Sequence, residues 1–374
     1  MAESSRRIVR IPSHRQLSRA DFRNKRVLVR VDFNVPIENG EIEDVERITA
    51  AMPTVKKCLE RGAAEVNIVT HLGRPKSAND KEFSTAILAK KVGELLREKN
   101  PPKAGKTDID SLALNSFYQV GPKVRLFENL RYDSGEEKNS VTFAKKLALL
   151  GDVCVIDAFA NLHREHASMM AVQSLLPTFA GLLVEKEVNS LFSLLNNPDH
   201  PFICVIGGAK VEDKMPIMEA LSDLADTIII GGMTANEYIL KGHVKGEKIF
   251  LPMDGINKVG AIVPINEQTL KAGVFDIGPQ TIMLYKSILS SAKTIFWNGN
   301  LGMSENKRYV HGTYEIARFI AKLKAQKVVS GGNTAQVIDE LKIADRFSFI
   351  STGGGATSTF ISGEKMPALE MLLK

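Results

Sequence analysis

The sequence predicts an α/β protein with two doubly wound parallel-sheet (Rossmann-like) domains joined by a hinge helix. Two observations carry this prediction. Short runs rich in valine and isoleucine alternate with longer helical patterns along the whole chain, as they do in βαβ units. The chain also has 374 residues, which is too long for one ordinary hydrophobic core, so two domains are expected.

The apolar runs are bounded by turn residues, which is typical of parallel strands buried on both faces. Strands are expected at residues 26–31, 65–70, 123–127, 153–156, 202–206, 227–230, 293–297, 327–330 and 347–351. Helices are expected at residues 46–60, 83–98, 143–150, 185–196, 215–221 and 315–325. Each strand is thus followed by a segment long enough to cross over to the next one.

The clearest break in the chain follows the helical pattern at 185–196. The segment Asn-Asn-Pro-Asp-His-Pro interrupts the chain there before the next strand, as turn-forming residues do. We therefore expect an N-terminal domain over residues 1–184, completed by the C-terminal tail 362–374. A linker helix and hinge would occupy 185–199, and a C-terminal domain would occupy 200–361. A ligand site would then lie in the cleft between the two lobes.

Composition argues against several classes of protein. Hydrophobic residues make up 44% and charged residues 25% of the chain, as in globular proteins. No apolar stretch reaches the roughly 18 residues that cross a membrane. The first residues lack the apolar core of a secretory signal, so a cytoplasmic protein is expected. The three cysteines show no C-x-x-C spacing, which favours buried core residues over disulfides or metal ligands.

The net charge of +6 is compatible with nucleic acid, a membrane surface or an acidic small molecule as the ligand. Aromatic residues are only 6% of the chain, so stacking platforms for bases are scarce. An acidic metabolite is therefore favoured, although scattered surface lysines would explain the charge equally well. Nothing in the sequence demands a partner chain, and a monomer is expected.

Basic and short polar residues follow the strands of the N-terminal half. Ligands of open α/β sheets bind beyond the carboxyl ends of the strands. The candidates there are Asp32, Phe33, Asn34, His71, Leu72, Gly73, Arg74, Arg131 and Arg164, and a further candidate, Arg47, opens a helix after the turn at 41–44. Arginine binds carboxylate and phosphate bidentately and keeps its charge. Any one of these arginines could be an ordinary solvated side chain, but the set favours a basic pocket.

Glycine-rich turns follow the strands of the C-terminal half. The first reads Gly-Gly-Ala-Lys-Val-Glu-Asp-Lys at 207–214, and others fall at 297–305, 330–336 and 351–360. Glycine lets the backbone approach phosphates closely, and a helix that follows offers free N–H groups. Lys210 and Lys214 would share one helix face. The glycines could form tight turns only, but the three turns at 297–305, 330–336 and 351–360 on one sheet edge favour a phosphate site. The Walker A spacing is absent.

These segments resemble the phosphoglycerate kinase family. VRVDFNVP, THLGRPKS, ENLRYDSGEE and DAFANLHREHAS are similar to its N-domain signatures, in the family's order. GGAKVEDK, DIGPQT, WNGNLGMSE, SGGNTAQ and STGGGATSTF are similar to its C-domain motifs. The resemblance runs from about residue 27 to residue 367. It implies reversible, Mg²⁺-dependent phosphoryl transfer between 1,3-bisphosphoglycerate and ADP, which gives 3-phosphoglycerate and ATP in glycolysis.

The resemblance also implies a role for each matching residue. The ten candidates of the N-terminal half would bind 3-phosphoglycerate or 1,3-bisphosphoglycerate. ADP or ATP would be bound by Gly208, Ala209, Lys210, Lys214, Asn298, Glu305, Gly331, Gly332, Asn333, Thr334, Gly353 and Gly354. Arg47, Lys210 and Lys214 would be catalytic. Transfer would be direct and in line, after closure of the two lobes.

The nucleotide half departs from the family at several positions. Asn333 stands where the family has an aspartate that contacts the metal, and Asn300 stands where it has a proline. Met303 and Ser304 replace a Val-Phe pair before Glu305. Asn333 keeps a carbonyl ligand but loses its charge, so weaker metal affinity or slower turnover is expected. In the N-terminal half Ala160 stands where the family has a glycine, but the acid-binding residues are intact.

Three interpretations remain at this point. The leading one is an active kinase of this family. The second is a catalytically weakened relative that binds ligands with an impaired nucleotide and metal site. The third, nucleic-acid binding, rests only on the net charge and would require steeply salt-dependent binding.

Overall fold

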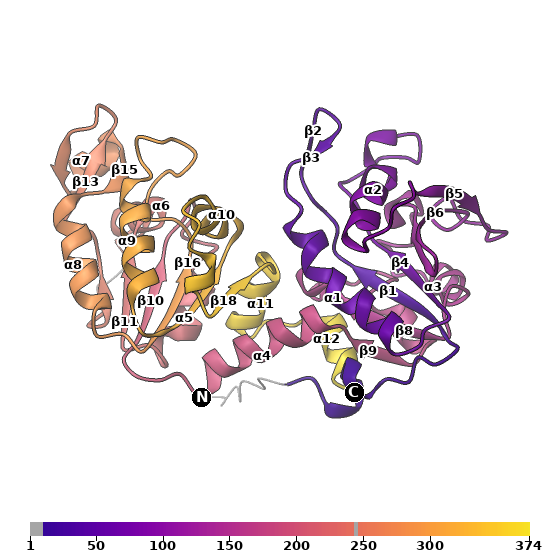
Figure 1. The fold of residues 1–374 in the computed structure, drawn as a ribbon. Helices are drawn as coiled ribbons and strands as arrows, with labels where there is room; N and C mark the ends of the chain where they lie inside the picture. The colour runs from indigo at the N-terminus through magenta and orange to yellow at the C-terminus, as the bar shows by residue number, and fades with distance from the viewer. Residues whose placement is uncertain (1–9, 243–245) are drawn as a thin grey trace. The chain divides into compact units, whose positions relative to one another are not determined.

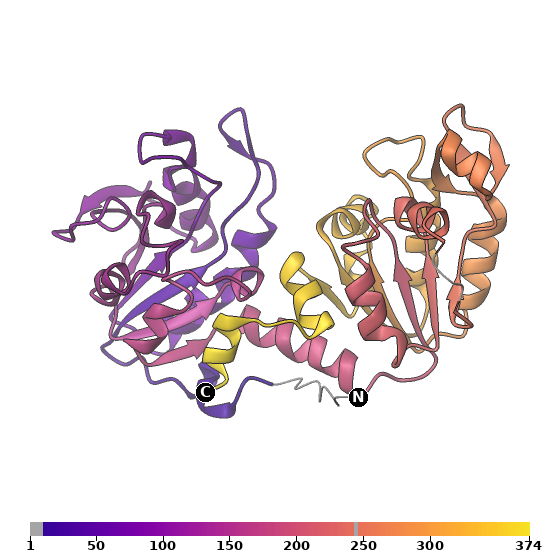
Figure 2. The same cartoon turned by 180° about the vertical axis from the view of Figure 1, so that it is seen from behind.

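The computed structural model describes residues 10–242 and 246–374, which form two compact units. The N-terminal unit comprises residues 10–189 together with Lys365–Lys374, and the C-terminal unit comprises Ser190–Glu364. The division falls inside helix α4 (Leu182–Asn196). Figures 1 and 2 show each unit as a sheet with helices around it. The part of the expected N-terminal domain at 1–9 lies outside the described residues.

The N-terminal unit is built on a seven-stranded sheet of order β5-β6-β7-β4-β1-β8-β9. These strands are β1 (Arg26–Val31), β4 (Glu65–Val69), β5 (Lys103–Lys106), β6 (Ser116–Gly121), β7 (Val124–Phe127), β8 (Val153–Asp157) and β9 (Thr178–Ala180). Its helices are α1 (Glu46–Glu60), α2 (Ala86–Leu95), α3 (Val141–Ala148) and α12 (Pro367–Leu372). The strands from β7 to β9 are parallel, whereas β6 is antiparallel to both of its neighbours. A short hairpin joins β2 (Ile37–Glu38) to β3 (Glu41–Ile42).

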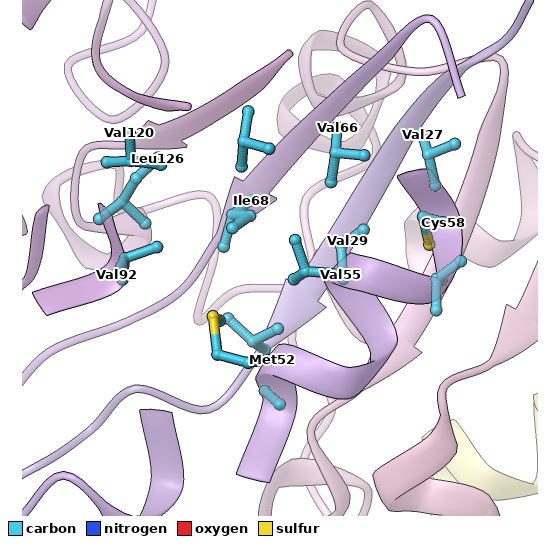
Figure 3. Close-up of a cluster of buried hydrophobic side chains, with 14 of the residues drawn as sticks. Val27, Val29, Met52, Val55, Cys58, Val66, Ile68, Val92, Val120 and Leu126 are labelled. Atoms are coloured by element: carbon cyan, nitrogen blue, oxygen red, sulfur yellow. The ribbon is translucent and has the colours of Figure 1, made fainter. Parts of the chain in front are cut away.

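Helix α1 packs on one face of this sheet through its apolar residues. Met52, Val55 and Cys58 project from the helix towards Val27 and Val29 of β1 in Figure 3. All of them are almost completely buried. Every residue of β1 after Arg26 is buried, as expected of a strand that is covered on both faces.

The C-terminal unit contains a parallel six-stranded sheet of order β12-β11-β10-β16-β17-β18. These strands are β10 (Phe202–Ile206), β11 (Thr227–Ile230), β12 (Ile249–Phe250), β16 (Thr294–Asn298), β17 (Gln326–Ser330) and β18 (Phe349–Ser351). Its helices are α5 (Met215–Ser222), α6 (Gly232–Leu240), α7 (Glu267–Ala272), α8 (Pro279–Leu289), α9 (His311–Lys322), α10 (Gly332–Glu340) and α11 (Gly355–Ser362). An antiparallel sheet pairs β13 (Asp254–Asn257) with β14 (Ile262–Pro264) and β15 (Val274–Ile277).

Short 3-10 helices complete the described elements. They are η1 (Ser13–Arg15), η2 (Leu17–Arg19), η3 (Lys81–Phe83), η4 (Leu130–Tyr132), η5 (Phe159–Asn161), η6 (Ala171–Ser174) and η7 (Ala344–Arg346). Two of them, η4 and η5, lie just beyond the carboxyl ends of β7 and β8. They therefore occupy the edge where ligands of such sheets bind.

The predicted fold class is confirmed, and each expected strand is present within two residues of its expected bounds. Helix ends were less well predicted. The predicted helix at 315–325 begins at His311 and ends at Lys322, because Leu323 is extended. The antiparallel strands β5, β6, β13, β14 and β15 were not predicted, because they are short and most of them contain polar residues or glycine.

The three cysteines are free and buried, as predicted. None of the helices within the described part of the chain is long and apolar enough to cross a membrane.

Candidate active site

In the N-terminal unit the segments that follow β1, β4 and β7 are joined to one another. The Gly73 N–H donates to Asn34 Oδ1 (2.8 Å), and the Arg131 guanidinium donates to the Gly73 carbonyl. Asn129 holds the same turn from both sides, because it accepts from the Leu72 N–H (3.2 Å) and donates to the Leu72 carbonyl (2.7 Å). The structure therefore brings the predicted residues of three strand ends to one edge of the sheet.

Arg47 reaches this edge from α1. Its guanidinium forms an ion pair with Asp32, which follows β1 and is almost completely buried. Asp32 Oδ1 also lies 3.8 Å from His71 Nδ1. One end of the Arg47 guanidinium is thus held by a carboxylate, while a third of the side chain remains exposed.

Arg30 lies beneath these residues, and the sequence interpretation did not include it. It sits inside β1 and its side chain is completely buried. The guanidinium donates to Ser168 Oγ (2.9 Å), to Asn161 Oδ1 (3.0 Å) and to the Val31 carbonyl. Its remaining contact is with His71 Nδ1 at 3.2 Å. A charged residue that is buried must have hydrogen-bonding or ionic partners. An arginine inside an otherwise apolar run was therefore the sequence signal that could have indicated this buried network.

The contact with Arg30 determines the tautomer of His71. A guanidinium has donors only, so His71 Nδ1 must accept and the ring proton must be on Nε2. Burial lowers the pKa of His71 well below its usual value, and the charges of Arg30, Arg131 and Arg164 act in the same direction. His71 is therefore a neutral imidazole that offers an Nε2–H donor.

Glu136 supplies the buried negative charge that accompanies Arg30. It accepts from the Ser168 N–H (2.9 Å) and the Ser168 hydroxyl (2.6 Å), and this hydroxyl in turn accepts from Arg30. Burial would raise the pKa of Glu136, but the contact with His166 and the charge of Arg30 lower it overall. Arg30, Ser168 and Glu136 thus form one buried polar chain.

The edge of this sheet carries more positive than negative charge. Burial lowers the pKa of Arg131, and Arg164 and Arg74 lie close enough to lower it further. Arg131 has Glu137 as a partner at 2.9 Å, but neither Arg74 nor Arg164 has an ion pair with any described residue. Uncompensated arginines in close proximity provide a site for an anion. The side chains of Phe33 and Leu72 are buried, so these two predicted residues would contact a ligand only through their backbone.

In the C-terminal unit the loops beyond β10 and β16 pack tightly together. The Gly208 N–H donates to the Asn300 carbonyl (2.9 Å). A Cβ atom on Gly207 or on Gly299 would approach backbone atoms of the opposite loop to 2.2 Å. These two glycines are therefore required by the close approach of the loops themselves.

The glycines at the starts of α10 and α11 are not required by packing against another part of the protein. A Cβ atom on Gly332, Gly354 or Gly355 would meet no atom within 4 Å. Neither helix has a side-chain cap among the described residues. Uncapped helix N-termini with open space before them are suited to phosphate groups. The predicted residues Gly331, Thr334 and Gly353 flank the same positions, where Thr334 Oγ1 accepts from the Gly299 N–H (3.1 Å).

The two predicted lysines differ in their surroundings. Lys210 is exposed, next to exposed Ala209, and has no ion pair with a described residue. Lys214 is largely buried, donates to Asn298 Oδ1, and has its pKa lowered by that burial. The prediction that they share a helix face is wrong. They lie in the turn before α5, which begins only at Met215, where Pro216 favours the first helical turn.

Asn333 lies at the N-terminus of α10 and contacts Glu305, another of the predicted nucleotide-binding residues. Its Nδ2 donates to Glu305 Oε1 at 3.1 Å, and both residues are exposed. The described residues include no group of three or more His, Cys, Asp or Glu side chains that could hold a metal ion. A metal at this edge would therefore depend on few protein ligands.

Open helix N-termini suit a polyphosphate, and unpaired arginines suit a small acid. Together with two parallel-sheet units, they define the class of α/β kinases that phosphorylate a small acidic substrate. The family model described as phosphoglycerate kinase matches residues 17–245 and 234–364. The chain belongs to the phosphoglycerate kinase family.

Individual relatives agree with this assignment. The chain is 37% identical over 381 residues to the phosphoglycerate kinase of Finegoldia magna, covering 93% of this chain and 96% of that one. It is 36% identical to that of Coprothermobacter proteolyticus, covering 96% and 98%. The solved phosphoglycerate kinase from Coxiella burnetii has a TM-score of 0.80 at 32% identity, covering 96% and 98% of the two chains. That from Pyrococcus horikoshii has a TM-score of 0.79 at 30% identity, with the same coverage.

The predicted family and the predicted phosphoglycerate kinase function are confirmed. The alternative of a catalytically weakened binding protein is not favoured by these comparisons. The family acts on small molecules and generally uses ATP or ADP with Mg²⁺.

Proposed function

We propose that the N-terminal and C-terminal units each bind a different substrate of the reaction. The arginine cluster of the N-terminal unit binds the carboxyl and phosphate groups of 3-phosphoglycerate or 1,3-bisphosphoglycerate. The glycine-lined helix N-termini and lysines of the C-terminal unit bind ADP or ATP. The observation that carries the proposal is the absence of ion-pair partners for Arg74 and Arg164 among the described residues, because arginines left unpaired by the protein are free to bind an anion.

In this scheme the transfer is direct. An oxygen of the ADP β-phosphate attacks the phosphorus of the acyl phosphate, the bond from phosphorus to the carboxyl oxygen breaks, and 3-phosphoglycerate leaves as a carboxylate. Arg47 and Lys210 stabilise the charge on the moving group, and Lys214 fixes the phosphates of the nucleotide. His71 donates from Nε2 and needs no change of charge. No enzyme residue is phosphorylated.

Asn333 is the proposed protein ligand for Mg²⁺. Its Nδ2 donates to Glu305, so the amide oxygen remains available as an acceptor. Mg²⁺ is commonly held by few protein oxygens together with substrate phosphates, and this fits the small number of carboxylates at this edge. When bound with the nucleotide, the ion neutralises phosphate charge.

The proposal is tested by measuring ATP formation from ADP and 1,3-bisphosphoglycerate with purified protein, with and without Mg²⁺. We expect turnover that requires Mg²⁺. Calorimetry with 3-phosphoglycerate and with MgADP then examines each half of the site separately. Tight binding of the acid without binding of the nucleotide would contradict the proposed role of the C-terminal unit.

The variant Asn333→Asp tests the metal ligand. It adds a charge for Mg²⁺ but also loses the donor to Glu305 and places two carboxylates side by side. We expect the metal contribution to dominate, so that the Mg²⁺ concentration for half-maximal activity falls about tenfold, which corresponds to about 1.4 kcal/mol. Asn306→Asp adds the same charge in the neighbouring loop and serves as the control. An equal shift in both variants would mean that Asn333 is not a ligand.

A cytoplasmic, monomeric protein is proposed as well. The support is the glycolytic role of the family and the three reduced, buried cysteines, which suit a reducing compartment. Sedimentation of the purified protein measures the oligomeric state.

A further inference from the structure

Asn300 connects two loops at the edge of the C-terminal sheet. It lies in the loop after β16, and its side chain is only 4% exposed. Its Nδ2 donates to Ser304 Oγ (2.5 Å) and to the Asn333 carbonyl at the start of α10 (3.3 Å). The backbone at Asn300 is fixed in turn, because its carbonyl accepts from the Gly208 N–H and leaves no room for a Cβ atom on Gly207.

A second contact closes these residues into a ring. Ser304 is followed directly by Glu305, whose carboxylate accepts from Asn333 Nδ2 at 3.1 Å. The ring therefore runs from Asn300 to Ser304, along the chain to Glu305, across to Asn333 and back to Asn300. It fixes the distance between the side chain of Glu305 and the N-terminus of α10.

Stability does not explain an amide at position 300. Asn300 Oδ1 is buried and accepts no hydrogen bond from a described residue, and a buried acceptor without a partner costs free energy. Leucine has nearly the same size and would avoid that cost. The amide is nevertheless suited to its place in one respect, since a single Nδ2 can donate two hydrogen bonds.

We propose that Asn300 is a positioning residue for nucleotide binding, which holds Glu305 and the N-terminus of α10 at the separation that the nucleotide requires. This inference rests on the proposed role of these two groups as nucleotide ligands. Asn300 does not touch the substrate in this scheme. It acts through the groups that do, and neither aspartate nor leucine supplies its two donors.

The test is the variant Asn300→Leu, with the KM for ADP, the KM for 1,3-bisphosphoglycerate and the melting temperature measured together. We expect the KM for ADP to rise about five- to tenfold, as for the loss of two hydrogen bonds. The KM for the acid should stay within twofold, and the melting temperature should be unchanged or higher. Ser304→Ala should produce a smaller rise, and the double variant should show less than the product of the two effects, because both remove the same bond.

Asn236→Leu is the matched control. Asn236 is a buried asparagine of the same unit whose amide donates to the Val274 carbonyl (2.8 Å), outside the ring. We expect this variant to lower the melting temperature and to leave both KM values unchanged. If Asn300→Leu behaves in the same way, or if Ser304→Ala leaves the KM for ADP unchanged, the positioning role is wrong. Failure of the proposed function would look different, because the unaltered protein would then bind no MgADP in calorimetry.

Discussion

Replacement of Lys210 by alanine is expected to lower kcat about 10²- to 10³-fold, the size of effect seen when one preorganised charge is removed from a transition state. Lys210 is exposed in the turn between β10 and α5 and has no ion pair with a described residue. It therefore contributes little to stability, and the loss should appear in catalysis. The measurement is kcat under saturating substrates, with the melting temperature as a check on folding.

The control for this prediction is Lys271→Ala. Lys271 is an exposed lysine of the same unit that pairs with Glu267 one turn earlier in α7. Such surface pairs contribute at most about 1 kcal/mol, so kcat should be unchanged. A loss of less than tenfold in Lys210→Ala would exclude Lys210 as the residue that stabilises the transferred group.

Replacement of Arg30 by methionine is expected to destabilise the N-terminal unit by about 3–5 kcal/mol, because it removes the guanidinium charge near the buried Glu136 and the donors to Ser168 and Asn161. Arg30 reaches Glu136 through Ser168 and is completely buried. Chemical denaturation of the purified protein measures the effect. Arg26→Met is the matched control on the same strand, since its pair with Asp152 is half-exposed and should contribute at most about 1 kcal/mol.

The same variant should also raise the pKa of His71. In the unaltered protein His71 has a strongly lowered pKa, so it stays neutral down to pH values well below its usual 6.5. Removing Arg30 removes the donor to Nδ1 and one of the positive charges, so the pKa of His71 should rise towards its usual value. Burial, the main cause of the lowered pKa of His71, remains in the variant. Nitrogen NMR of the imidazole should therefore show the Nε2–H tautomer in the unaltered protein and a titration that moves to higher pH in the variant. An Nδ1–H tautomer in the unaltered protein would contradict the assignment.

Residues just beyond strand ends could be predicted from the sequence. Arg74 and Lys210 were proposed in this way, since apolar runs locate the strands and the carboxyl ends of parallel strands share one edge. Arg30 could not be found by the same rule, because it lies inside a run that reads as a buried strand. Its role depends on Ser168 and Asn161, which are 138 and 131 residues away in the chain.

The sequence by itself determined the fold class, the order of the strands along the chain and the identity of the basic and glycine-rich segments, because these depend on local hydrophobic patterns and on motifs of adjacent residues. Only the tertiary structure decided which of those residues have their charge or hydrogen-bonding groups paired with another residue. It paired Arg47 with Asp32 and joined Asn300, Ser304 and Asn333 in one ring. It also assigned the proton of His71 to Nε2 through Arg30. The physical reason is that charge compensation and hydrogen-bond direction depend on distances between atoms from different strands and loops, and spacing along the chain does not encode those distances.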